Sequence, residues 1–198
     1  MVIVRGWTSS EAPMAARQLL AITPPRRAAR RKLVEDICGG DPTARKRATD
    51  VARLASAKEP GLLSDYADVL LDVLFELHAA VVAEDPAAEW QSFGYLALTA
   101  AHNVTTRAQR VRLVELIRPM IEEGRTALQA TAIEVFARVA AVEPELRDEA
   151  LAMLGEIRFH GTPATSARAR AMLALLLPGT VYDWRADWET RRKMTAIR

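Results

Sequence analysis

The chain has 198 residues, of which half are apolar and 26% are charged, and its formal net charge is +2. The 36 Ala and 22 Leu residues, the strongest helix formers, far outnumber the 11 aromatic residues. This composition predicts an all-α protein that is long enough to bury a core. It argues against a β-sandwich, a disulfide scaffold, a disordered chain and a membrane protein.

Proline and glycine divide the chain into helix-length segments. Asp41-Pro42, Asp85-Pro86 and Thr162-Pro163 each have the pattern of an N-cap residue followed by proline at the first helical position. Glycines such as Gly39-Gly40 and Gly161 lie where helices should end. With the 3.6-residue apolar period, these signals predict helices at residues 12–22, 26–38, 42–57, 61–82, 86–102, 106–123, 125–141, 144–158, 163–177 and 183–196. Pro119 predicts a kink or break in the helix at 106–123.

The helix starts recur at a regular spacing. Successive helix pairs begin near Pro42, Pro86, Arg125 and Pro163, which are 44, 39 and 38 residues apart. Two helices in a unit of about 40 residues is the spacing of HEAT and armadillo repeats.

Two stretches also resemble HEAT repeats in sequence. The first runs Asp41-Pro42-Thr43-Ala44-Arg45-Lys46-Arg47-Ala48 and continues with Val51 and Leu54; the second starts at Glu123 and includes Ala127, Ala132, Val135 and Val139. The resemblance implies a right-handed α-α superhelix of about four helical hairpins over residues 41–178. Residues 1–40 would then form an N-terminal helical cap, and residues 179–198 a C-terminal capping helix. An irregular helical bundle is the alternative.

Charge is segregated along the chain. Residues 1–58 carry a net charge of +7, residues 59–106 contain no Lys or Arg and carry −8, and residues 107–198 carry +3. Such polarity can steer or select a partner, or it can be neutralised inside one molecule.

Four acidic residues form a candidate partner-binding ridge. Asp65, Asp68, Asp72 and Glu76 fall on one face of the helix expected at 61–82, and that helix has no Lys or Arg. The ridge is either a docking surface for a basic partner, or solvated, or paired with arginines of a neighbouring helix.

A second candidate is a basic face for phosphates or an acidic protein. It comprises Arg26, Arg27, Arg30, Arg31, Arg45, Lys46 and Arg47. The third candidate, an aromatic surface, combines Trp184, Trp188 and Arg191 at i, i+4 and i+7. The alternative is that both indoles anchor the last helix on the preceding repeat.

Catalytic and metal motifs are absent from the sequence. His78, His102 and His160 do not form a zinc-binding pattern, and His102 and His160 are expected to cap helix C-termini. Cys38 is the single cysteine, so no internal disulfide is expected. We therefore expect no metal, no cofactor and, by default, a cytoplasmic protein. The excess of Arg over Lys suggests bacterial coding.

Two functions follow from these patterns. The first is a non-catalytic protein-protein interaction or scaffold module that uses the charge-polarised surfaces of a solenoid. The second is a DNA-binding protein that resembles the HEAT-like glycosylases of alkylated bases. Arg45, Arg47, Trp184 and Asp187 supply the residue types for that activity, although no site motif of that family matches.

Overall fold

The computed structural model describes residues 11–21, 26–83, 85, 88–123 and 126–177. Within these ranges all regular secondary structure is helical, which confirms the all-α prediction. The α-helices are α1 (Ala12–Ala21), α2 (Arg26–Cys38), α3 (Pro42–Lys58), α4 (Ala67–Val82), α5 (Trp90–Asn103), α6 (Arg107–Glu123), α7 (Thr126–Ala140), α8 (Arg147–His160) and α9 (Pro163–Leu176). Two short 3-10 helices, η2 (Ser64–Tyr66) and η3 (Pro144–Leu146), precede α4 and α8. The helix expected at 183–196 lies outside the described residues.

Side-chain caps start α3 and α9 where the sequence predicts. The Asp41 carboxylate accepts a hydrogen bond of 2.9 Å from the Thr43 N–H, and the Thr162 hydroxyl accepts one of 3.3 Å from the Thr165 N–H. Each cap residue precedes a proline at the first helical position, where the missing N–H has no consequence.

A third cap, at the start of α6, was not predicted. Thr106 and Gln109 form a reciprocal capping box, in which the Gln109 N–H donates to the Thr106 hydroxyl at 3.2 Å. The Thr106 N–H donates back to Gln109 Oε1, also at 3.2 Å. The sequence signal for this cap is the spacing Thr-x-x-Gln.

The helix expected from residue 61 begins later, at Ala67. Gly61 has φ +83°, a left-handed conformation that interrupts a helix. The Leu63 N–H donates to Asn103 Oδ1 at 2.6 Å, and the Ser64 and Tyr66 N–H groups each donate to the carbonyl three residues before them. Residues 61–66 therefore form a turn and η2 before α4 starts.

The prediction of a helix start at Pro86 is also wrong. Ala88 and Glu89 are not helical, and α5 begins at Trp90. The predicted break at Pro119 does not occur, because α6 continues through it to Glu123. An interior proline lacks its own backbone donor and its ring crowds the carbonyl four residues before it, and yet α6 stays helical on both sides of Pro119.

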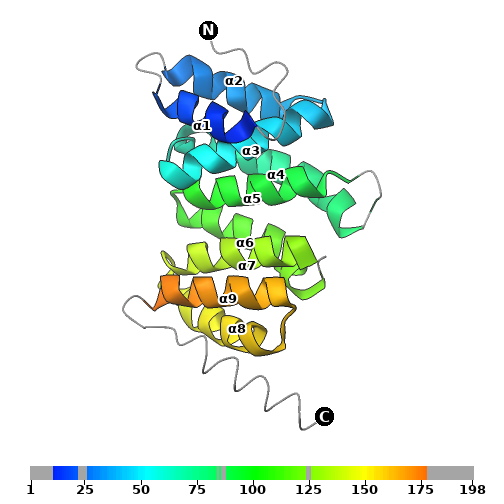
Figure 1. Ribbon diagram of the computed structural model, residues 1–198, viewed down its shortest axis with the longest axis vertical. Coiled ribbons are helices and arrows are strands. Elements are labelled where there is room, and N and C mark those ends of the chain that lie inside the picture. Colours follow the sequence, from blue (N-terminus) through cyan, green and yellow to red (C-terminus); the bar gives the residue numbers. More distant parts are fainter. Residues whose placement is uncertain (1–10, 22–25, 84, 86–87, 124–125, 178–198) are drawn as a thin grey trace.

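The helices stack along the long axis of the molecule, with α1 and α2 at one end and α8 and α9 at the other (Figure 1). Helices α1, α3, α5, α7 and α9 pack consecutively on one another and form one row, which we call the odd row. Helices α2, α4, α6 and α8 form the even row, in which α4 packs on both α2 and α6. Within each hairpin an even-row helix packs on the next odd-row helix, as α6 does on α7 and α8 on α9.

Alanine lines the closest contacts between the rows and within them. In α3 the side chains of Ala48, Ala52 and Ala55 are fully buried, and α3 packs more extensively on α5, with its buried Ala97 and Ala100, than on any other helix. Small side chains let helix axes approach closely, while Phe93 and Phe136 fill the larger spaces of the same continuous core. The large number of alanines in the sequence is thus used for helix packing.

Candidate functional site

The acidic ridge lies on the even row and is partly neutralised there. Asp68 accepts a hydrogen bond of 3.1 Å from Gln109 Nε2, and Asp72 pairs with Arg112 at 2.7 Å. Both partners belong to α6. The same Gln109 amide caps α6 through its oxygen, so the ridge and the cap share one side chain. Asp65 lies in η2, and both Asp65 and Glu76 are exposed.

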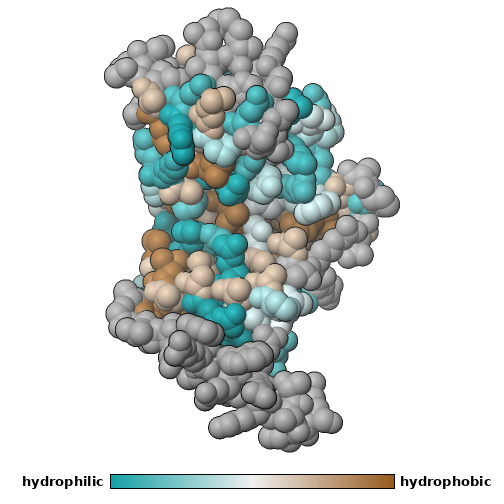
Figure 2. All heavy atoms as spheres, viewed as in Figure 1, coloured by the Kyte–Doolittle hydropathy of each residue, from teal (hydrophilic) through white to brown (hydrophobic). Residues whose placement is uncertain are grey.

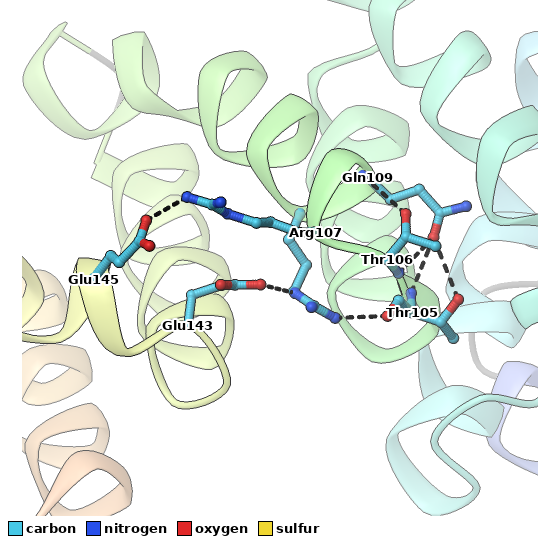
Figure 3. Close-up of polar contacts among 7 residues, drawn as sticks. Thr105, Thr106, Arg107, Gln109, Glu143 and Glu145 are labelled. Carbon is cyan, nitrogen blue, oxygen red and sulfur yellow. Dashed lines mark hydrogen bonds and ion pairs between the residues drawn. The ribbon is translucent and has the colours of Figure 1, made fainter.

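Ion pairs also join α6 to the connection between α7 and α8 (Figure 3). Arg107 pairs with Glu145, and Arg110 pairs with Glu143 at 2.5 Å while donating to the Thr105 carbonyl at 2.8 Å. The Arg110–Glu143 pair is mostly buried, whereas Arg107 and Glu145 are exposed. The start of α6 is therefore fixed on both sides by side-chain contacts within the even row.

The α2 part of the predicted basic face makes mostly local contacts. Arg30 donates to the Leu62 carbonyl at 3.1 Å, and Arg31 pairs with Glu35 at 2.9 Å. Lys32 pairs with Asp36, and Arg27 is exposed. Arg26 begins α2.

The α3 part of the predicted basic face lies in the other row. Arg45 is mostly buried; it donates to the Ile37 and Gly39 carbonyls and pairs with Glu89. Lys46 and Arg47 are partly exposed. The seven predicted residues are therefore divided between α2 and α3, two helices of different rows that pack on each other.

A shallow pocket of about 290 Å³ lies between the N-terminal ends of α3 and α5. Lys46 lines one side, and Trp90, which is partly exposed, lines the other. Its remaining lining residues are Pro42, Thr43, Ala88, Glu89, Gln91 and Ser92.

The titratable groups singled out in the sequence are spread over several helices. His102 and His160 lie in the last turns of α5 and α8, as predicted. Burial lowers the pKa of His78, and burial together with the charge of Arg138 lowers the pKa of His102. Burial and the nearby Glu76 raise the pKa of the Cys38 thiol. No group of three or more potential metal ligands occurs in the part of the chain that the structure describes.

The odd row carries a cluster of arginines that the sequence patterns did not single out. In α3, Arg53 pairs with Asp50 at 2.5 Å and its guanidinium lies 4.9 Å from the centre of the Tyr95 ring of α5. In α7, Arg138 pairs with Glu134 at 2.7 Å, and Arg168 of α9 pairs with the other oxygen of the same carboxylate. We call Arg53, Arg138 and Arg168 the arginine row.

Buried carboxylates hold the arginine row in place. The side chains of Asp50 and Glu134 are only 12% and 10% exposed, whereas those of the three arginines are 29–43% exposed. The i, i+3 spacing of Asp50 and Arg53 and the i, i+4 spacing of Glu134 and Arg138 were visible in the sequence. The contact between Glu134 and Arg168 could not be seen in the sequence, because these residues are 34 positions apart.

In the structure, charge is divided between the two rows of helices, and not between three consecutive segments of the chain. The odd-row helices contain nine Lys and Arg residues and two acidic residues, whereas the even-row helices contain eleven of each. The helices of the odd row therefore carry a net charge of +7 and those of the even row a net charge of zero. Figure 2 shows hydrophobic side chains on the visible face in several separate areas, with hydrophilic side chains between them.

The predicted aromatic surface of Trp184, Trp188 and Arg191, together with Asp187, lies outside the described residues. None of the described helices is long and apolar enough to cross a membrane. Comparison of the chain with protein-family models, with curated proteins and with solved structures gives no match.

Proposed function

We propose that this protein is a non-catalytic protein-protein interaction or scaffold module, a cytoplasmic HEAT-like solenoid whose charge-polarised surfaces contact a protein partner. The observation that carries the proposal is the difference in charge between the rows, +7 against zero, on a stack of paired helices. A two-row stack offers extended faces made of successive helices, which suits the binding of another macromolecule.

Ion pairs and hydrogen bonds already occupy many charged side chains of the even row, so we expect the partner to bind the odd row. Arg112 neutralises Asp72 of the acidic ridge, Gln109 donates a hydrogen bond to Asp68, and further ion pairs join α6 to the α7–α8 connection. The odd-row helices retain a surplus of positive charge after Asp50 and Glu134 are counted, and also after Arg45 is paired with Glu89. A surplus of one sign on one face favours a partner of the opposite sign.

The test is affinity capture by the full-length tagged protein at low salt (about 50 mM) and at about 500 mM. We expect specific proteins to be retained at low salt and released at high salt. Reproducible absence of any retained protein at low salt would contradict the proposal.

A second candidate, binding of duplex DNA in the manner of HEAT-like alkylated-base glycosylases, is favoured by the same positive odd row. Of the residue types suggested for it, Arg47 is partly exposed, but Arg45 is committed to the Ile37 and Gly39 carbonyls and to Glu89. A gel-shift experiment with duplex DNA at low salt tests this candidate, and no shift would remove it.

A further inference from the structure

The arginine row offers hydrogen-bond donors that are fixed before any ligand arrives. Arg53 and Arg138 each use Nε and Nη2 on a buried carboxylate, and Arg168 uses Nη1. Among the contacts of the described residues, Nη1 of Arg53, Nη1 of Arg138, and Nε and Nη2 of Arg168 have no acceptor. A guanidinium that is already oriented loses less side-chain entropy when it binds an anion.

The three arginines lie on the odd-row helices α3, α7 and α9, and their side chains are 29–43% exposed. Arg53 contacts Tyr95 of α5, Arg138 influences the pKa of His102 of α5, and Arg168 reaches Glu134 of α7. Arg53 therefore lies beside α5, and Arg138 and Arg168 meet at Glu134 between α7 and α9. The guanidinium groups of Arg138 and Arg168 stay accessible, because their side chains are 30% and 43% exposed.

We propose that the arginine row binds an extended acidic segment of a partner protein. The carboxylates of that segment accept hydrogen bonds from the unused N–H groups of Arg53, Arg138 and Arg168. The proposal rests on the proposed function and adds the face and the chemistry of the partner. Planar guanidinium groups match carboxylates in paired geometry. Lys46 and Arg47, which lie on α3 beside this row, add positive charge at its α3 end.

The dimensions of the row favour a short peptide over duplex DNA. Three steps between neighbouring helices, at about 8–10 Å each, span roughly 25–30 Å. An extended segment of about eight or nine residues covers that length. A duplex of the same length carries roughly 15 phosphate charges, far more than three half-neutralised arginines and two neighbours can match.

The experiment measures fluorescence anisotropy of three labelled probes with the full-length protein at low salt. The probes are an acidic peptide of about nine residues with repeating Asp-Gly-Glu, a basic peptide with repeating Lys-Gly-Arg, and a duplex of about 20 base pairs. The key variant is Arg168→Gln, which leaves Glu134 paired with Arg138. Its matched control is Arg118→Gln on α6, because Arg118 is equally exposed and also pairs with a glutamate of another helix, Glu149.

We expect the acidic peptide to bind, and Arg168→Gln to weaken its binding by about fivefold or more while Arg118→Gln changes it little. Circular dichroism and thermal melting establish that both variants are folded. Equal effects of the two variants, no binding of the acidic peptide, or tighter Arg168-dependent binding of the duplex would each overturn the inference. If captured proteins are still retained equally by both variants, the proposed function stands and only this inference fails.

Discussion

Replacing Asn103 tests how the α3–α5 contact that supports the candidate face is held together. Asn103 is fully buried at the end of α5. Its Oδ1 accepts from the Leu63 N–H at 2.6 Å, and its Nδ2 donates to the Ser56 hydroxyl at 2.9 Å and to the Thr99 carbonyl at 2.7 Å. One amide thus ties α3, α5 and the turn before α4.

The expected cost of Asn103→Ala follows from these three contacts. A net hydrogen bond contributes about 1 kcal/mol, and a buried N–H left without an acceptor costs about 1–3 kcal/mol. The Leu63 N–H and the Ser56 hydroxyl would both be stranded in a buried site. We therefore expect Asn103→Ala to lower the free energy of unfolding by about 3 kcal/mol.

Urea denaturation followed by circular dichroism measures this change. The comparator is Ser56→Ala, which removes one of the three contacts and leaves the Leu63 N–H paired, so it should cost about 1 kcal/mol. If Asn103→Ala costs no more than Ser56→Ala, the Asn103 amide is not what organises the turn, and the reasoning is wrong.

Three further predictions concern charged and titratable groups. Glu134→Gln removes the shared charge between Arg138 and Arg168 and should lower the free energy of unfolding in urea by about 1–2 kcal/mol; no change would mean that the carboxylate does not hold the arginines. Because the pKa of Cys38 is raised by burial and by Glu76, its reaction with a thiol reagent should show a pH midpoint above that of a cysteine peptide, and Glu76→Gln should lower the midpoint; a midpoint below the peptide's would contradict this. The unfolded chain takes up a proton at His102 at higher pH than the folded protein, so stability should fall as pH drops from about 7 to about 5. His102→Gln should reduce that fall in urea unfolding, and a pKa above the ordinary histidine value by NMR would refute the argument.

Local signals predicted most of the secondary structure, and long-range contacts explain the misses. The bounds of α2 and the caps at Asp41 and Thr162 depend on residues a few positions apart, so the sequence contains them. The turn that precedes α4 is held by a distant residue, because the Leu63 N–H donates to Asn103, which lies 40 residues later in the chain. Helix propensities describe only neighbouring residues, so they cannot predict a hydrogen bond to a residue as distant as Asn103.

The same distinction applies to the candidate sites. Asp68 and Asp72 share a helix face as predicted, but their partners on α6 are about 40 residues away, which turned half of the predicted docking ridge into internal contacts. Asp50 with Arg53 and Glu134 with Arg138 had the spacing of helix pairs, which is common on solvated helices and gave no reason to single them out. Only the placement of α9 beside α7 brings Arg168 to the same carboxylate and reveals a row.

Alternation of helices between two rows explains why charge along the chain is a poor guide to charge on the surface. The basic block at residues 1–58 supplies α1 and α3 to the odd row but α2 to the even row, where Arg31 and Lys32 meet local acids. The acidic block at residues 59–106 places its charged helix, α4, in the even row, and its other helix, α5, has no Asp or Glu. The odd row thereby receives basic helices without receiving acidic ones. A partner that responds to the charge of this protein should therefore bind across successive helices of one row, and not along a continuous segment of sequence.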